Sequence, residues 1–134
     1  RNAIQRLALL PIVALFLLPA ACHRTDGRAE ALLNNADSLL TANPDSALRL
    51  LEALPATTEL TRRESARYAL LLAQATDKCE KPLLPCDSLL DVALDYYDDD
   101  ERERAVALLY KGRLEVEMEQ SERAIGLSLI HISE

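Results

Sequence analysis

The sequence predicts an all-α protein built from antiparallel helix pairs. Apolar side chains recur at steps of three and four residues in five successive segments, a pattern typical of helices with one buried face. No segment shows the apolar–polar alternation of a half-buried strand. Alanine and leucine dominate, and small side chains let neighbouring helices approach closely. The same Asp-Ser dipeptide begins at Asp45 and at Asp87, 42 residues apart, a period typical of stacked helical repeats.

The first predicted pair occupies residues 29–54. The inner face of its first helix consists of Ala29, Leu32, Leu33, Ala36, Leu39 and Leu40. Asn43 and Pro44 have the residue types of an N-cap and a first helical residue, so the second helix should begin there. Its inner face consists of Ala47, Leu50, Leu51 and Leu54. Pro55 prevents the helix from continuing.

The second predicted pair starts at Thr61, which forms a capping box with Glu64. The inner face of its first helix consists of Ala66, Ala69, Leu70, Ala73 and Thr76. Pro82 and Pro85 then interrupt the helical pattern. The inner face of the following helix consists of Leu89, Leu90, Val92, Ala93, Tyr96 and Tyr97.

A fifth helix is predicted from Glu101 to about Glu119, with Asp100 as its N-cap. The acidic residues at this point are favourable at the positive end of a helix. The expected inner face consists of Ala105, Leu108, Leu109, Gly112 and Val116. A turn should follow near Gln120, so that the next helix completes a third pair.

Residues 102–125 resemble the tetratricopeptide repeat (TPR). Leu108, Gly112 and Ala124 occupy the places of its large residue, its small residue and its alanine, and the last two lie where the helices of one repeat touch. Lys111 and Glu115 depart from the pattern, which has leucine and tyrosine there. The weaker resemblance spans residues 28–126 and implies a TPR-like α-solenoid, incomplete at its C-terminal end. A self-contained antiparallel bundle is the alternative.

The amino end resembles a bacterial lipoprotein signal. Two arginines precede an apolar run from Leu7 to Leu18, and two alanines then precede Cys22. The resemblance implies a signal peptide over residues 1–21, lipid attachment at Cys22 and a tether over residues 22–27. A plain signal peptide cut before Cys22 and an uncleaved anchor are alternatives. The usual signal has leucine where Pro19 stands, and the run is short for a membrane span.

Two further resemblances concern localisation and the end of the chain. The nearest family is that of TPR lipoproteins of Gram-negative envelopes, and His23 after the lipidated cysteine implies sorting to the outer membrane. The last eight residues, LSLIHISE over 127–134, resemble the translation of a transposon adapter used in sequencing libraries. We therefore expect an N-terminal fragment of a longer protein, with residues 127–134 outside its fold.

Charge and histidine content argue against several classes of function. The chain carries 15 basic and 22 acidic residues, a net charge of −7, which opposes binding to nucleic-acid phosphates. Apart from His131 in the excluded tail, the histidine is His23 in the tether. No Ser-His or Cys-His pair can therefore form in the helical domain. We expect no catalytic residue and no cofactor.

The cysteines and acidic residues of the helical domain do not predict a metal site. Cys79 and Cys86 lack a second pair of ligands for zinc. In an oxidising envelope they would either form a disulfide across the turn or remain free thiols packed at helix ends. The acidic run 98–101 lacks the ligand spacing and the glycine of a calcium loop.

These features favour a non-catalytic interaction module. The resemblance implies a lipid-anchored TPR scaffold whose concave face holds a protein or peptide partner. The domain's tyrosines would either line that face or pack in the core; they are Tyr68, Tyr96, Tyr97 and Tyr110. One alternative is a glycan-binding outer-membrane lipoprotein, which the lack of tryptophan disfavours. Another is the sensor part of a longer TPR signalling protein, which the sequence after Gly126 would decide.

Overall fold

The computed structural model describes residues 27–133, and these form helices and short connections with no strand among them. The elements in chain order are α2 (Arg28–Leu39), α3 (Pro44–Glu52), α4 (Arg62–Lys78), the 3₁₀ turn η1 (Leu84–Cys86), α5 (Asp87–Tyr96) and α6 (Glu101–Ser133). The all-α prediction is confirmed. The predicted signal peptide, Cys22 and most of the tether lie outside the described residues.

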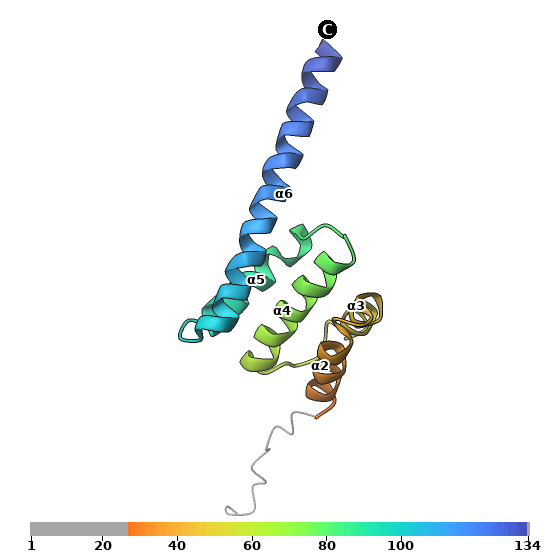
Figure 1. The fold of residues 1–134 in the computed structure, drawn as a ribbon, viewed down its shortest axis with the longest axis vertical. Coiled ribbons are helices and arrows are strands. Elements are labelled where there is room, and N and C mark those ends of the chain that lie inside the picture. Colours follow the sequence, from red (N-terminus) through yellow and green to blue (C-terminus); the bar gives the residue numbers. More distant parts are fainter. Residues whose placement is uncertain (1–26, 134) are drawn as a thin grey trace, which may run out of the picture.

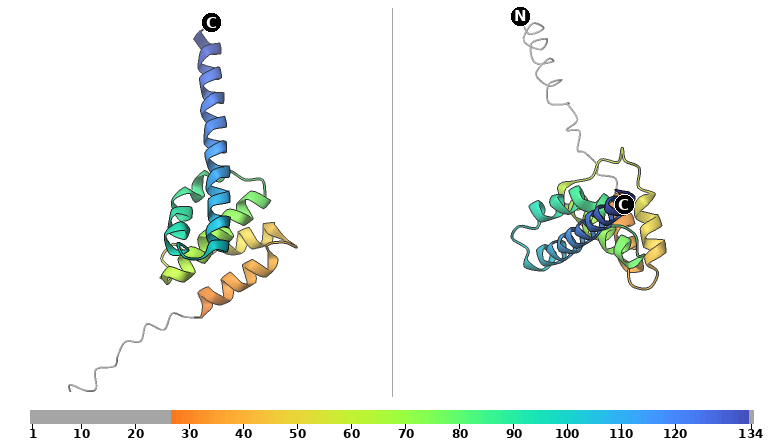
Figure 2. Two further views of the ribbon diagram at one scale, coloured as in Figure 1. Left: turned by 60° about the vertical axis from the view of Figure 1, so that its left-hand side comes forward. Right: turned by 90° about the horizontal axis from the view of Figure 1, so that it is seen from above.

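The helices pack as successive hairpins (Figure 1). Helix α2 packs against α3, and α4 packs against α5, each across a short connection. Helix α4 lies in the middle of the body, because it also contacts α2, α3 and α6. Helix α6 packs against α5 and α4 near its start, and its far half projects beyond the other helices (Figures 1 and 2).

The predicted helix starts are confirmed by their capping contacts. Asn43 Oδ1 accepts a hydrogen bond from the backbone N–H of Ser46 at 3.1 Å, and Pro44 is the first residue of α3. Thr61 and Glu64 form both bonds of a capping box at the start of α4, at 3.1 and 2.8 Å. Asp100 Oδ1 accepts from the N–H of Glu103 at the start of α6. Each cap satisfies a backbone donor that the helix leaves unpaired.

Two apolar clusters hold the body together, and α4 contributes to both. One lies between α2, α3 and α4; its buried residues are Leu33, Ala36, Leu40, Ala47, Leu48, Leu51, Leu71 and Ala75. The other lies between α4, α5 and α6; its buried residues are Ala69, Leu70, Ala73, Leu83, Cys86, Leu90, Ala93, Ala107 and Leu114. The inner faces predicted for α2 and α4 are confirmed. In α3, Leu48 is buried although the prediction omitted it.

The inner face predicted for α5 is partly wrong. Leu90 and Ala93 are fully buried as expected, but Val92 and Tyr96 are 43% and 38% exposed. The helix spans only ten residues and contacts α4 on one side and α6 on the other. Val92 and Tyr96 lie on the side that neither neighbour covers.

The inner face predicted for α6 is also wrong. Leu108, Leu109 and Val116 are 51%, 59% and 53% exposed, and Ala105 and Gly112 are exposed as well. The buried residues are Ala107 and Leu114, on the opposite side of the helix, with Val106 and Tyr110 packed beside them. The helix thus carries two apolar stripes, and the sequence pattern followed the stripe that the body does not cover.

The expected turn near Gln120 does not form, because α6 continues without a break to Ser133. Residues 120–125 contain no proline and no glycine, so nothing in them stops a helix. The TPR-like packing positions Leu108, Gly112 and Ala124 therefore meet no second helix of the same chain within residues 27–133. The described residues confirm packed helical hairpins, and they do not form a complete third pair.

Candidate functional site

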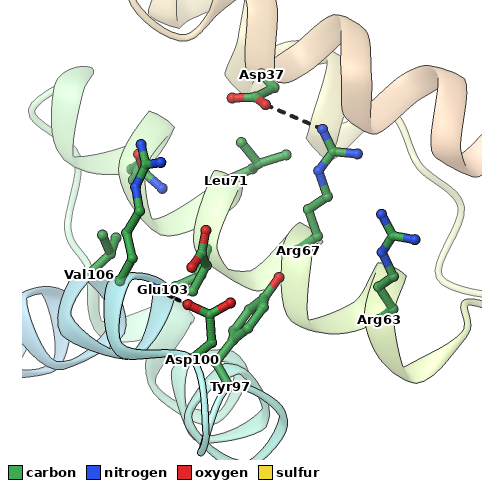
Figure 3. Close-up of a pocket in the computed structure, with 11 residues that line it drawn as sticks. Asp37, Arg63, Arg67, Leu71, Tyr97, Asp100, Glu103 and Val106 are labelled. Carbon is green, nitrogen blue, oxygen red and sulfur yellow. Dashed lines mark hydrogen bonds and ion pairs between the residues drawn. The ribbon is translucent and has the colours of Figure 1, made fainter.

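A groove runs between α2, α4 and the first turns of α6, and it encloses about 510 Å³ (Figure 3). Its lining side chains come from α2 and α4, the first helices of the two hairpins, from the turn before α6 and from the start of α6. The lining residues are Asp37, Arg63, Arg67, Leu70, Leu71, Gln74, Tyr97, Asp100, Arg102, Glu103 and Val106. Helix α4 lies between α2 and α6, so its side chains line the middle of the groove, and those of α2 and α6 line its two sides.

Arg67 is fixed in place by neighbours from α2. Its guanidinium donates hydrogen bonds to Asn34 Oδ1 at 2.7 Å and to Asp37 Oδ2 at 3.3 Å, and its side chain is 24% exposed. The ion pair with Asp37 crosses the groove wall in Figure 3. Arg67 therefore ties α2 to α4 and leaves less of its donor capacity for a ligand.

Arg63 and Arg102 are more available to a ligand than Arg67. The Arg63 side chain is 68% exposed, and its nearest carboxylate oxygen, from Glu30, lies 3.9 Å away. Within residues 27–133 no carboxylate lies within ion-pair distance of the Arg102 guanidinium. Arginine presents five N–H donors in a planar fork, which suits carboxylates and backbone carbonyls.

Two acidic side chains at the start of α6 supply acceptors beside these arginines. Asp100 and Glu103 share a hydrogen bond, which lowers the pKa of Asp100 and raises the pKa of Glu103. Figure 3 shows both carboxylates near Tyr97, which is half-buried. The groove therefore offers donors and acceptors side by side, next to apolar carbon from the buried Leu71 and the half-buried Val106.

The start of α6 is held in position by contacts on its inner side. Lys111 Nζ lies 2.6 and 2.7 Å from carboxylate oxygens of Asp87 and Asp91 on α5, and these hydrogen bonds raise the pKa of Lys111. Arg113 pairs with Asp77 of α4 at 2.7 Å. These two links join α6 to α5 and to α4 beside the buried Ala107 and Leu114.

A third contact joins α6 to the loop before η1. The Glu117 carboxylate accepts a hydrogen bond from the backbone N–H of Leu83 at 2.9 Å. Leu83 is buried in the cluster between α4, α5 and α6. A buried backbone donor without a partner is costly, so Glu117 stabilises the loop between α4 and α5.

The two cysteines of the described residues are free thiols, which is one of the two alternatives that the sequence left open. Cys79 packs against the cluster of α2, α3 and α4, whereas Cys86 is buried in the cluster of α4, α5 and α6. Burial raises the pKa of both thiols, and a hydrogen bond with Asp45 adds to the effect at Cys79. Each sulfur therefore fills a different part of the interior as a small apolar group.

The tyrosines divide between the two roles that the sequence left open. Tyr68 packs against the first cluster and donates a hydrogen bond to the carbonyl of Leu51 at 3.4 Å, and Tyr110 packs against the second cluster. Tyr97 lines the groove. Tyr96 lies in a smaller hollow beside Val92, on the other side of the body, and meets the edge of the Tyr97 ring.

Sequence reasoning missed the groove arginines and the true inner side of α6. Arg63, Arg67 and Arg102 carry no motif, and only the packing of α2, α4 and α6 brings them to one groove. The inner side of α6 had a signal in the sequence, because Ala107, Tyr110 and Leu114 also follow helical spacing. The prediction instead took the stripe through Leu108, which follows the same spacing.

The groove is lined by arginines, carboxylates, a glutamine, a tyrosine and aliphatic side chains. It contains no histidine or cysteine, and within residues 27–133 no three side chains of ligand type gather to hold a metal ion. Over the same residues, none of the helices has the length and apolar character required to cross a bilayer. No protein-family model, curated protein or solved structure matches this chain.

Proposed function

We propose that this chain is a non-catalytic scaffold of the bacterial envelope that holds an extended segment of a protein partner in the groove between α2, α4 and α6. The observation that carries the proposal is that α2 and α4, the first helices of the two hairpins, and the start of α6 line one groove. Stacked helical hairpins with TPR-like packing present such shared grooves to peptides. We therefore favour a TPR-like stack over a self-contained bundle.

The mixture of groups in the groove supports an extended peptide as the ligand. A peptide backbone carries one donor and one acceptor at nearly every residue. Arg63 and Arg102 can donate to its carbonyls or to an acidic side chain, and Asp100 can accept from its N–H groups. A phosphate ligand fits less well, because the groove also contains Asp37, Asp100 and Glu103.

Anchoring to the membrane belongs to the same proposal. Lipid attachment at Cys22 would tether the helical body to the envelope, with the outer membrane as the expected location. In cells that express the full chain, labelled palmitate should enter the protein. The Cys22→Ser variant should lose both the label and sedimentation with membranes, and unchanged labelling would contradict lipidation at this cysteine.

A peptide-selection experiment tests the groove. A phage-displayed library of random linear peptides is selected against the full chain, and the affinity of the enriched peptides is measured by fluorescence anisotropy. Arg102→Glu should raise their Kd by about tenfold or more, the effect of losing one charged hydrogen bond. Arg49→Glu on the exposed side of α3 is the matched control and should leave the Kd unchanged.

Two results would contradict the proposal. The first is that no linear peptide is enriched over an unrelated helical protein. The second is that Arg49→Glu weakens binding as strongly as Arg102→Glu, because that would show an effect of net charge alone. Binding of α-glucans that depends on Arg102 would instead support the glycan-binding alternative.

A further inference from the structure

The outer side of α6 is an apolar stripe that the body leaves uncovered. We call the set Ala105, Leu108, Leu109, Gly112 and Val116 the outer stripe. Its three large members are each more than half exposed, at 51%, 59% and 53%. It lies opposite Ala107 and Leu114, the two residues of α6 that are buried. A continuous apolar helix stripe in water is typical of a surface that another helix covers.

The other hairpins show what kind of helix would fit. Helices α2 and α4 each pack against the helix that follows them across a short turn, and such neighbours run antiparallel. Helix α6 has no following helix within residues 27–133. The outer stripe is therefore the surface of α6 against which an antiparallel helix could pack.

Gly112 at the centre of the stripe has no explanation within residues 27–133. A Cβ placed there would meet no atom within 4 Å, and the residue has ordinary helical backbone angles. Glycine is less favourable than alanine inside a helix, so neither its conformation nor packing against the described residues accounts for it. Close approach of a second helix from outside does account for it.

We propose that this helix is α6 of a second copy of this chain, packed antiparallel and crossing at Gly112. A two-fold axis through that point makes the same surface serve both copies. It places Leu108 of one copy beside Val116 of the other, so that the exposed apolar residues cover each other. The contact uses residues 101–123 and none of the tail over 127–134.

Charge complementarity selects this partner and this direction. Glu101 and Arg123 lie equally far from Gly112 along the helix, and both lie beside the outer stripe. Arg123 pairs with Glu119 of its own helix at 2.9 Å, but its side chain stays 76% exposed and can also reach a second carboxylate. An antiparallel pair therefore sets Glu101 of each copy against Arg123 of the other, whereas a parallel pair sets like charges together. The basic residues near the crossing are already neutralised, because Lys111 is bound to Asp87 and Asp91, and Arg113 to Asp77.

The size of the contact predicts a reversible dimer. One helix from each copy gives an interface at the low end of the specific range, below about 1,200 Å² of buried surface. The association should accordingly depend on protein concentration. None of the groove-lining residues belongs to the outer stripe, so the dimer would carry two copies of the proposed peptide site.

Sedimentation velocity of the full chain in a non-ionic detergent tests the dimer. A monomer–dimer equilibrium should be seen, and Leu109→Asp should raise its dissociation constant by tenfold or more. Val92→Asp is the matched control, because Val92 is an exposed apolar residue on α5 outside the stripe. Circular dichroism should show unchanged helix content in both variants. A monomer at every concentration, or equal effects of the two substitutions, would overturn the proposal.

A charge swap tests the register and direction. Glu101→Arg and Arg123→Glu should each weaken the dimer, since each sets like charges together twice. The double variant should restore the dissociation constant to within about threefold of the original, because the pairs reform with reversed sign. If the double variant is as weak as the single variants or weaker, the antiparallel register about Gly112 is wrong. Peptide binding to the groove is measured separately and does not depend on this result.

Discussion

Residues 66–76 of α4 and residues 118–133 of α6 are both helical and both contain many aliphatic side chains, but they differ completely in burial. Six apolar residues of the α4 segment are buried: Ala66, Ala69, Leu70, Leu71, Ala73 and Ala75. Every residue from 118 to 133 is exposed, including Ile125, Leu129 and Ile132. The comparison teaches that helix formation and burial are separate properties of a sequence. Burial supplies most of the stability of a helix in a folded protein.

The largest expected effect on stability comes from truncating a leucine to alanine in the buried core, compared with the same truncation on the exposed side of α6. Leu90 is fully buried between α4, α5 and α6, whereas Leu109 is 59% exposed. Leu90→Ala should lower the free energy of unfolding by about 2–5 kcal/mol, through lost transfer energy and the remaining cavity. Leu109→Ala should change it by less than about 0.5 kcal/mol. Urea unfolding of dilute protein, where association does not contribute, measures both values.

Equal losses at the two positions would break the comparison. In that case the outer stripe would be as well packed as the core in the monomer. Leu108→Ala is a second exposed control on the same stripe, with a side chain 51% exposed, and it should behave as Leu109→Ala does.

An intermediate effect on stability is expected at the N-terminus of α4, because α4 packs against α2, α3, α5 and α6. Thr61→Ala removes the hydroxyl that accepts from the N–H of Glu64 and leaves half of the capping box. The free energy of unfolding should fall by about 1 kcal/mol, within the range of about 0.5–2 known for N-caps. Thr57→Ala, in the exposed loop before α4, is the matched control and should have no effect on the urea midpoint. A loss at Thr57 as large as that at Thr61 would show that the cap does not stabilise α4.

The smallest expected effect is a loss of stability at alkaline pH, caused by titrating groups that lie within the packed helices and not in the projecting half of α6. Burial raises the pKa of Tyr68, of Tyr110 and of Cys86 in the folded protein. The unfolded chain therefore loses these protons at lower pH than the folded chain does. Their stabilising contribution is fully present below the unfolded pKa values and is lost as the pH rises from about 8.5 to above 10.

Urea unfolding over this pH range checks the sign. The free energy of unfolding should fall with rising pH, and Tyr110→Phe should make the fall less steep because one titrating group is gone. Lys111 acts in the same direction, since its hydrogen bonds to Asp87 and Asp91 raise its pKa. A free energy of unfolding that stays constant or rises above pH 9 would contradict the assignment of these groups to the interior.

Much of the fold could be predicted because its signals are local. Asn43, Thr61 and Asp100 cap helices through bonds to residues three positions away, and such bonds depend on nothing distant in the chain. The buried sides of α2 and α4 were also predicted, because each helix has one dominant apolar stripe. Capping residues and apolar stripes can each be recognised within the sequence of a single helix.

The candidate site could not be predicted in the same way. The groove arginines Arg63 and Arg102 lie 39 residues apart, and neither belongs to a pattern that distinguishes it from the other surface arginines. The spacing of Cys79 and Cys86 suited a disulfide, but their side chains enter different clusters. Both outcomes depend on how helices pack against each other.

The sequence by itself determined that this chain forms helices, where α3, α4 and α6 begin, and which side of α4 is buried. Caps, prolines and a single apolar stripe involve residues that are close together in the chain. Their effect on a helix can therefore be predicted without knowing how the helices pack. Only the tertiary structure decided which stripe of α6 faces the body. Both apolar stripes of α6 follow helical spacing, so periodicity does not distinguish them. The stripe that packs against α4 and α5 is flanked by Lys111, Arg113 and Glu117, whose partners lie on α5, α4 and the loop before η1 and come together only when the helices pack.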